Sequence, residues 1–191
     1  MKQFPLITAY MPNHNYEAYI EQAIESIINQ SFSNWELIII LDGVIDNSLD
    51  IIARYKKKFP QKIFIINNKI RKGLQISANK ALKIARGKYF IRLDPDDYFN
   101  ENAFLVMANY LEKNKKVSMV FPDYFYVDKS SNILNVDTRK KIGKETKALD
   151  LPAHGACTMF RTSELRNLHG YSTKFKAQDG YDIWYKMFEN N

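Results

Sequence analysis

The sequence predicts an α/β fold in which a mostly parallel, Rossmann-like sheet is covered by helices on both faces. Four apolar runs rich in β-branched residues start about 26 to 30 residues apart, which is the spacing of strand–helix–strand units. The connections between these runs carry apolar residues at helical spacing. After the fourth run the alternation stops, so the last third of the chain is expected to be arranged differently.

The four expected strands are Leu6–Met11, Glu36–Leu41, Lys62–Ile66 and Tyr89–Leu93. Strands that are apolar on both faces are typical of parallel sheets that lie between two layers of helices. The three connecting helices are expected within Tyr16–Ile28, Leu49–Phe59 and, less regularly, Ile76–Ala85.

The last third begins with a helix that Asn100 can cap. Two neighbouring strands are expected next, over Val117–Val127 and Asn132–Val136. Arg139–Leu151 is polar, basic and weakly periodic, which predicts a surface loop. A short strand and two helices are expected within His154–Asn191. We see no interdomain linker, so the sequence predicts one α/β domain.

Composition excludes several classes of protein. With 191 residues, 46% of them hydrophobic, the chain can bury a large core as one ordered domain. Cys157 is the only cysteine, which excludes an internal disulfide and favours a reducing, cytoplasmic setting. No window reaches the roughly 18 apolar residues of a spanning helix, and Met1–Pro5 does not resemble a signal peptide.

The net charge of +7 predicts attraction to polyanions, namely nucleic acid, anionic lipid or nucleotide diphosphates. The sequence has no zinc-finger spacing, RNP motif or basic heptad region, so we expect no nucleic-acid partner. Peripheral association with the anionic inner face of a membrane stays open. The alternative is a solvated surface rich in lysine.

An acidic run follows the fourth strand and places three carboxylates within four residues, at Asp94, Asp96 and Asp97. In an extended segment side chains alternate, so Asp94 and Asp96 are expected to point the same way. Two such carboxylates repel each other unless a cation lies between them, and a hard divalent cation that also carries phosphate ligands fits this need. The alternative is a solvated acidic turn, because Asp and Pro favour turns.

Polar residues also follow the other three strands: Pro12–Asn15, Asp42–Ser48, and Asn67–Lys69 with Arg71–Gly73. Ligands of open α/β sheets bind at the carboxyl ends of strands, so these groups are expected to converge. Asp42 can accept a hydrogen bond from a base or ribose, and His14 can stack on a ring. The alternatives are a turn residue and a helix-start residue. Because the chain lacks a Gly-x-Gly-x-x-Gly motif and a phosphate loop, a bound diphosphate would need a metal ion.

A set of motifs stands in order along nearly the whole chain: Met11–Tyr16, Ala23–Phe32, Trp35–Gly43, Asp46–Ser48, Asn79, Ala85–Tyr89, Asp94–Asp97, His169–Tyr171 and Ala177–Trp184. Together they resemble the GT-A-fold glycosyltransferases of family 2, the inverting group that uses nucleotide-diphosphate sugars. The resemblance implies a single GT-A catalytic domain over residues 1–191. Its nucleotide-binding part would span about 1–98 and its acceptor-side part about 99–191, which can be incomplete at its C-terminal end.

By position, the resemblance implies that Asp42 contacts the nucleotide base in a pocket formed with Pro12, His14 and Asn15. It also implies that Asp94 binds the ribose-diphosphate, and that Mn²⁺ or Mg²⁺ is held by Asp94, Asp96 and Asp97. The donor would be a nucleotide-diphosphate sugar, with a UDP-sugar as the first expectation. A cation at this place would stabilise the charge that develops on the leaving diphosphate.

The resemblance further implies that Asp179 is the general base. A sugar hydroxyl is a poor nucleophile, so a carboxylate must take its proton during attack, and direct displacement inverts the anomeric centre. Without the resemblance, the sequence around Asp179 favours the alternative that it is a loop or helix-cap residue. On the acceptor side we expect His154, Gly155, Asp182 and Trp184, the last two with a structural role as the alternative. The acceptor would be a hydroxyl of a glycan, a lipid-linked sugar or a protein.

The chain departs from the family pattern at Leu41, His14, Ala78 and Gln178, where the family commonly has Asp, Tyr, Arg and Glu. These departures leave the identity of the nucleotide open. Two other functions also stay open, a non-catalytic nucleotide-sugar-binding or assembly module and a sugar nucleotidyltransferase. The second class usually has a Gly- and Arg-rich loop after its first strand, and Pro12–Asn15 is not such a loop.

Overall fold

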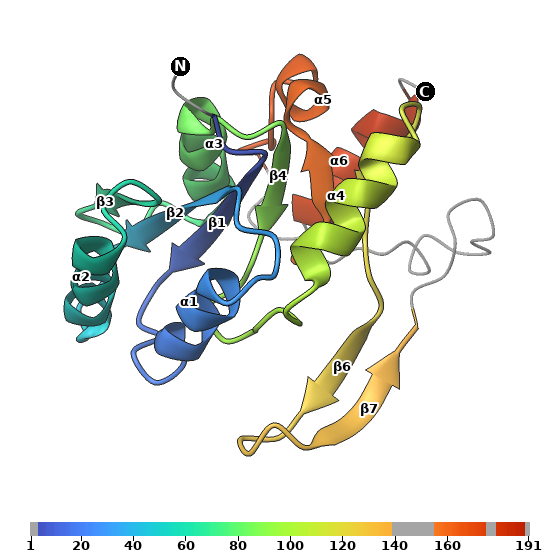
Figure 1. Ribbon diagram of the computed structural model, residues 1–191. Coiled ribbons are helices and arrows are strands. Elements are labelled where there is room, and N and C mark those ends of the chain that lie inside the picture. The colour runs from blue at the N-terminus through green and yellow to red at the C-terminus, as the bar shows by residue number, and fades with distance from the viewer. Residues whose placement is uncertain (1–3, 139–154, 175–178, 190–191) are drawn as a thin grey trace.

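The computed structural model describes residues 4–138, 155–174 and 179–189 (Figure 1). The strands of this part are β1 (Ile7–Asn13), β2 (Trp35–Asp42), β3 (Ile63–Asn68), β4 (Tyr89–Arg92), β5 (Met119–Val120), β6 (Tyr124–Val127), β7 (Ile133–Asp137) and β8 (Met159–Arg161). The helices are α1 (Ile20–Ile28), α2 (Ser48–Lys58), α3 (Leu74–Ile84), α4 (Ala103–Lys113), α5 (Thr162–Asn167) and α6 (Asp179–Glu189).

Six strands form one sheet in the order β3-β2-β1-β4-β8-β5. β1 pairs in parallel with β2 and with β4, and β2 pairs in parallel with β3. β8 lies antiparallel to its neighbours β4 and β5. Since the first four strands are parallel, their carboxyl ends lie at one edge of the sheet. This arrangement confirms the predicted fold class.

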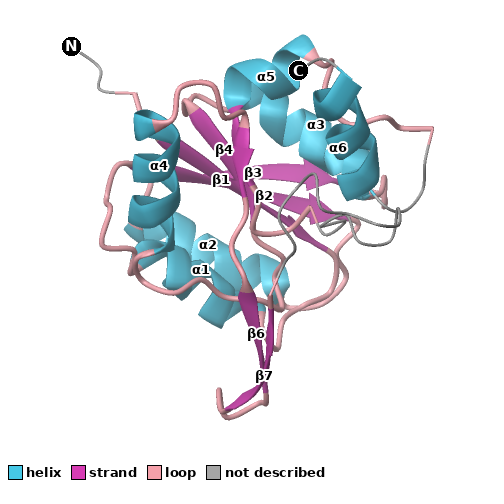
Figure 2. Ribbon diagram, turned by 90° about the vertical axis from the view of Figure 1, so that its right-hand side faces the viewer, coloured by secondary structure: helices cyan, strands magenta, loops and turns pink. Residues whose placement is uncertain are grey.

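Helices cover both faces of the sheet (Figure 2). Apolar residues of α1, α2 and α4 pack against one face, and those of α3, α5 and α6 pack against the other. In β2, Leu37 and Ile39 face the first layer whereas Ile38 and Ile40 face the second. Full burial of such a side chain stabilises the fold by about 1.5–3 kcal/mol, so β2 is held from both sides.

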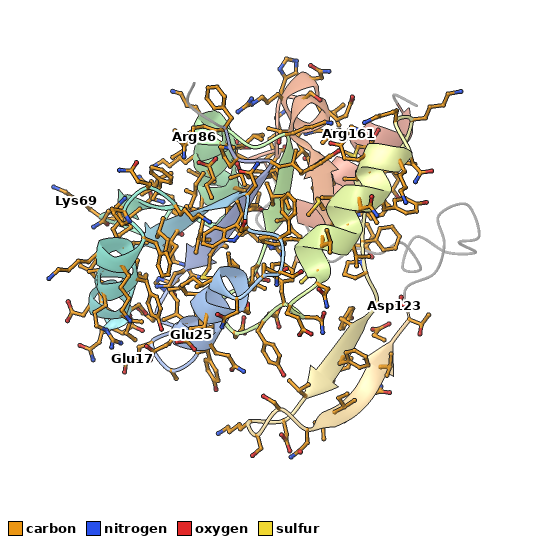
Figure 3. All side chains as sticks on the ribbon, viewed as in Figure 1. Glu17, Glu25, Lys69, Arg86, Asp123 and Arg161 are labelled. Atoms are coloured by element: carbon orange, nitrogen blue, oxygen red, sulfur yellow. The ribbon has the colours of Figure 1, made fainter. Side chains whose placement is uncertain are left out.

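At the amino ends of the strands, the buried carboxylate of Glu36 joins three segments. It accepts hydrogen bonds from the hydroxyl of Thr8 at 2.6 Å and from the backbone N–H of Arg86 at 2.7 Å. The Arg86 guanidinium forms an ion pair with the same carboxylate at 2.6 Å. Figure 3 shows Arg86 at the end of the molecule opposite to Asp123. This network stabilises the sheet far from the carboxyl ends of its strands.

β6 and β7 form a separate antiparallel pair that projects beyond the carboxyl ends of the main sheet (Figure 1). Asp128 closes the connection, because its Oδ1 accepts hydrogen bonds from the backbone N–H groups of Ser130 and Asn132. The structure thus confirms two neighbouring strands in this region. No helix in the described part of the chain combines the length and apolar character needed to cross a membrane.

Two predicted elements differ from the structure. Val117–Val127 is expected to be one strand, but β5 and β6 belong to different sheets. Pro122 separates them, because proline lacks an N–H and restricts the residue before it. The first helix is expected to include Tyr16, but α1 begins at Ile20 after Asn15 adopts a φ of 63° that redirects the chain. The loop expected at Arg139–Leu151 lies outside the described residues.

Candidate active site

A cavity of about 390 Å³ lies at the carboxyl ends of β1, β2 and β4. We call it the donor cavity, after the nucleotide-sugar donor that the sequence resemblance leads us to expect there. Its lining residues are Pro12, Asn13, His14, Tyr16, Asp42, Arg71, Gly73, Leu74 and Asp94–Asp97. The residues predicted to follow these strands therefore meet in one space. Of the nucleotide and metal residues expected from the sequence, only Asn15 does not line it.

Asp42 is buried and organises the loop at the start of α3. Its Oδ1 accepts hydrogen bonds from the backbone N–H of Lys72 at 2.8 Å and from Nδ2 of Asn68 at 2.9 Å. Its Oδ2 accepts a hydrogen bond from the backbone N–H of Gly73 at 2.8 Å. A carboxylate has about four acceptor positions, so the chain itself uses three of them. The loop that carries Arg71 to the cavity is held through this one side chain.

The glycine after Asp42 permits a close approach of two loops. Gly43 has a φ of +69°, and a Cβ at this position would lie 2.6 Å from the backbone nitrogen of Arg71. Only glycine adopts this backbone without strain and leaves room for the neighbouring chain. The Asp42-Gly43 pair therefore has a structural role as well as a place in the cavity.

His14 and Asn15 connect the first strand to the second. Nδ1 of His14 lies 2.8 Å from the carbonyl oxygen of Asp42. A carbonyl only accepts, so Nδ1 carries the hydrogen and the ring is held in one orientation. Oδ1 of Asn15 accepts a hydrogen bond from the backbone N–H of Ile45 at 2.9 Å. Asn15 thus fixes the loop around the cavity instead of lining it.

Asn13 is a feature of the cavity that the sequence interpretation did not single out. Its side chain is fully buried, and neither its Nδ2 nor its Oδ1 has a hydrogen-bond partner among residues 4–138, 155–174 and 179–189. Such a buried group costs about 1–3 kcal/mol when it is unpaired, and native proteins contain few of them. Because Asn13 lines the donor cavity, a ligand with matching polar groups can pair with it.

The acidic run is a turn and not the extended segment that the sequence predicts. β4 ends at Arg92, and the backbone N–H of Asp97 donates to the carbonyl of Asp94 at 3.1 Å. Asp at the first position and Pro at the second favour this kind of turn. Asp94, Asp96 and Asp97 nevertheless all line the donor cavity.

The three carboxylates of the turn differ in their surroundings. Nε of the buried Arg92 lies 3.0 Å from Oδ1 of Asp94, and its Nη2 donates to Oδ2 at 3.3 Å. Asp96 and Asp97 are exposed. The protein thus offsets the charge of Asp94 from inside, and Asp96 and Asp97 present theirs to the solvent side.

Tyr16 lies close to these carboxylates. Burial raises the pKa of its phenol, and the nearby charges of Asp96 and Asp94 raise this pKa further, whereas Arg71 opposes the shift. Tyr16 is a site residue that the sequence interpretation missed, because it was assigned to the apolar stripe of a helix. Arg71 was expected at this edge among the polar residues after the third strand, but it was given no role there, and it lines the cavity.

The acidic turn suits a cation that arrives with its substrate. Among the residues that the structure describes, no group of three His, Cys, Asp or Glu side chains is arranged to hold a metal ion. Mg²⁺ typically binds through one or two carboxylates together with substrate phosphates and water. Asp96 and its neighbours fit this open mode of binding, and they do not form a closed metal cage.

Three of the expected acceptor-side residues, Gly155, Asp182 and Trp184, are not among the residues that line the donor cavity. Asp182 accepts hydrogen bonds from the backbone N–H of Ser172 and from Nζ of Lys186, both at 2.8 Å. Trp184 is buried and packs edge-on against Phe121, with ring centres 5.1 Å apart. These contacts hold α6 in place. Gly155 is also buried. His154 and the side chain of Asp179 lie outside the described part of the chain.

Comparison with known proteins places this chain in a family. Residues 8–168 match the family described as Glycosyl transferase family 2. The chain belongs to glycosyl transferase family 2. Its relatives include an uncharacterized glycosyltransferase of Methanocaldococcus jannaschii, 31% identical over 193 residues, which covers 98% of this chain and 66% of the relative. A β-1,3-glucosyltransferase of Escherichia coli that uses UDP-Glc is 26% identical over 186 residues, which covers 97% of this chain and 71% of that protein.

Solved structures confirm the fold of this family 2 member. TarS of S. aureus (residues 1–349) in complex with UDP-GlcNAc superposes with a TM-score of 0.77 at 19% identity, over 96% of this chain and 53% of that fragment. A mannosyltransferase of Pyrobaculum calidifontis in complex with GDP-Man and Mn²⁺ gives a TM-score of 0.71 at 18% identity, over 94% of this chain and 51% of that protein. The chain therefore spans about half to two thirds of the length of most of these proteins.

Proposed function

We propose that this chain catalyses inverting transfer of a sugar from a nucleotide-diphosphate sugar to a hydroxyl group of an acceptor. The observation that carries the proposal is the donor cavity, in which Asp42 and His14 share one space with the acidic turn. Such a donor needs a site for its base and a site for its diphosphate within the length of one molecule. Family membership and the likeness to TarS, solved with UDP-GlcNAc, support this donor class.

The hydrogen bonds at Asp42 favour uridine as the nucleoside. Three backbone and side-chain donors already occupy its carboxylate, which leaves about one acceptor position for a ligand. The pairing edge of uracil carries a single N–H, whereas that of guanine carries two adjacent N–H groups. Beside Asp42, the amide of Asn13 can donate to a ring carbonyl. A UDP-sugar therefore fits this end of the cavity better than a GDP-sugar.

At the other end of the cavity, Arg71 and the acidic turn are proposed to bind the diphosphate. A Mn²⁺ or Mg²⁺ ion, held by Asp96 together with Asp94 and Asp97, would supply charge compensation for the departing diphosphate. The guanidinium of Arg71 can pair with phosphate oxygens directly. Arg92 keeps Asp94 in a fixed position for this purpose.

Asp179 is the proposed general base. The acceptor oxygen attacks the anomeric carbon as the bond to the diphosphate breaks, and the carboxylate takes the proton of the acceptor hydroxyl. Asp179 is the first residue of α6, and the packing of Asp182 and Trp184 positions that helix. The acceptor is proposed to be a glycan, a lipid-linked sugar or a protein. A cytoplasmic location and attraction to an anionic membrane surface stay predictions from the sequence.

Thermal melting in the presence of UDP-sugars tests the donor site. A ligand at 100 times its Kd stabilises the folded state by about 2.7 kcal/mol, which for a chain of this size raises Tm by roughly 5–10 °C. We expect this increase with a UDP-sugar and Mn²⁺ and its loss in Asp96→Ala. Asp50→Ala, which removes an exposed carboxylate of α2, is the matched control and should keep it. An equal increase in Asp96→Ala without added metal would contradict the role of the turn.

Turnover separates an enzyme from a binding module. Release of UDP from the donor, with or without an acceptor, should be detectable in the wild-type chain and should disappear in Asp179→Asn. Donor binding without any release of UDP would favour the non-catalytic module instead.

A further inference from the structure

Asp42 is connected to a positive charge outside the donor cavity through one side-chain amide. β2 and β3 pair so that Asp42 lies beside Asn68, and both side chains are buried. Nδ2 of Asn68 donates to Oδ1 of Asp42 at 2.9 Å. Nζ of Lys80, on α3, donates to Oδ1 of Asn68. The three residues therefore form a chain of two hydrogen bonds that runs from a cation through an amide to a carboxylate.

The charged groups at both ends fix the orientation of the Asn68 amide. An ammonium group only donates hydrogen bonds and a carboxylate only accepts them, so the amide turns its oxygen to Lys80 and its NH₂ group to Asp42. Oγ of Ser77, which lies 3.4 Å from Nδ2 of Asn68, accepts from the same NH₂ group. Hydrogen bonds in series also polarise one another. Lys80 thus both restrains this amide and strengthens the hydrogen bond that the amide donates to Asp42.

The Asn68 amide determines which oxygen of Asp42 is open to a ligand. Each carboxylate oxygen has about two acceptor positions. On Oδ1 of Asp42, Nδ2 of Asn68 takes one position and the backbone N–H of Lys72 takes the other. On Oδ2, the backbone N–H of Gly73 takes one, so the open position belongs to Oδ2. Asp42 lines the donor cavity whereas Asn68 and Lys80 do not, so a ligand can reach this oxygen without touching either residue.

The same chain of hydrogen bonds offsets part of the cost of burying the Asp42 carboxylate. A buried charge is costly unless hydrogen bonds or an opposite charge compensate it. A base that enters the cavity displaces water from Asp42 and raises this cost. Lys80 is exposed on α3, so its ammonium stays hydrated while it donates inward to Asn68. Screening by solvent keeps the contribution of such an exposed cation modest.

We infer that Lys80 is a positioning residue for recognition of the base: through Asn68 it holds Asp42 so that the open position of Oδ2 meets the ring N–H of uracil. This inference rests on the proposed function, because it takes Asp42 as the carboxylate that binds the base. N3 of uracil carries a proton, whereas N3 of cytosine carries a lone pair that an ionised carboxylate repels. Lys80 therefore contributes more to binding of UDP than to binding of CDP.

Calorimetric titration of the full chain with UDP and with CDP, each in the presence of Mn²⁺, tests the inference. We expect the wild type to bind UDP about tenfold or more tightly than CDP, because one hydrogen bond to a charged acceptor is at stake. Lys80→Met should weaken UDP binding about fivefold and CDP binding less than about twofold. Lys80→Arg keeps the charge and a donor, so it should restore most of the affinity for UDP. Lys83→Met removes the same charge from an exposed position of α3 and should leave both affinities unchanged.

A double-mutant cycle tests whether Lys80 acts through Asn68. Asn68→Ala removes the amide that links Lys80 to Asp42. In this background, Lys80→Met should change the affinity for UDP by less than about twofold, because two residues that act in series are not additive. A fivefold loss that persists without the amide would overturn the inference.

The outcomes distinguish this inference from the proposed function. If the wild type binds neither nucleotide, the proposed donor site is wrong. If UDP binds but CDP binds equally well, or if Lys80→Met loses affinity for both nucleotides to the same extent, only the inference about Lys80 is overturned. An equal loss in Lys83→Met shows a general effect of charge and also overturns it. Should Asn68→Ala not fold, the comparison of Lys80→Met, Lys80→Arg and Lys83→Met decides, since Lys80 and Lys83 are both exposed.

Discussion

Replacing Asp42 by Asn tests the role of this carboxylate in the donor cavity. The change keeps the size of the side chain but exchanges one acceptor oxygen for an NH₂ group. In the better of the two amide orientations, the remaining oxygen keeps the hydrogen bonds from Lys72 and Asn68. The backbone N–H of Gly73 then faces another donor and loses its partner.

The expected loss of folding stability follows from the number of hydrogen bonds that Asp42→Asn removes. One hydrogen bond to a charged acceptor contributes about 1.5–3 kcal/mol, and an unpaired buried N–H adds to the cost. A neutral amide is easier to bury than a carboxylate, which offsets part of this loss. We therefore expect destabilisation of about 2 kcal/mol, or a decrease in Tm of roughly 4–8 °C for a chain of this size. The loop with Arg71 should also lose its anchor, so UDP should bind about tenfold more weakly.

Differential scanning fluorimetry at neutral pH and calorimetric titration with UDP and Mn²⁺ measure the two effects. Asp50→Asn removes an exposed carboxylate from the first turn of α2 and should cost less than about 1 kcal/mol. If Asp42→Asn melts within 2 °C of wild type and binds UDP as tightly, the reasoning about its hydrogen bonds is wrong.

Two further predictions concern the scaffold. A Cβ on Gly87 would lie 2.4 Å from the backbone nitrogen of Thr8, so Gly87→Ala should lower the free energy of unfolding by about 3 kcal/mol, as measured by chemical denaturation. UDP binding should stay intact, because Gly87 lies at the amino ends of the strands. Reduced UDP affinity in the soluble variant would argue against this separation. The ammonium groups of Lys115 and Lys88 and the hydroxyl of Tyr89 lower the pKa of Glu112 to about 2 from an unfolded value near 4.5. The contribution of the Glu112 carboxylate to folding stability is therefore complete above about pH 4.5 and is lost as the pH falls toward 2. In Glu112→Gln, Tm should depend less on pH in that range than it does in the wild type.

The sheet could be predicted because its signals are local. β2 is apolar on both faces over consecutive residues, and such a run is stable only between two layers of helices. The limit at Pro122 was harder to place, since the apolar run continues on both sides of it. Its two halves pair with different partners, and pairing between distant strands leaves no local trace in the sequence. Tyr16 has helical spacing to the apolar residues of α1, but the prediction that it belongs to this helix was wrong. Asn15, just before it, has a positive φ that the apolar spacing does not reveal.

The candidate site was predictable in position and less so in detail. Polar residues after parallel strands must meet at one edge, and the donor cavity brings Asp42, His14 and the acidic turn together. The pairing of Arg92 with Asp94 replaces the expected extended geometry, because Pro95 favours a turn. Whether a buried amide such as that of Asn13 finds a partner depends on the whole fold, and no spacing rule reveals it.

The unpaired amide of Asn13 also affects how the molecule trades folding stability against recognition. An apolar residue of similar volume at the end of β1 would spare the empty protein a cost of about 1–3 kcal/mol. With Asn at this position, a ligand whose polar groups pair with the amide removes that cost on binding. Part of the binding affinity therefore comes from the lower stability of the unliganded fold. A substitution of Asn13 that raises the melting temperature should therefore weaken binding of the proposed nucleotide.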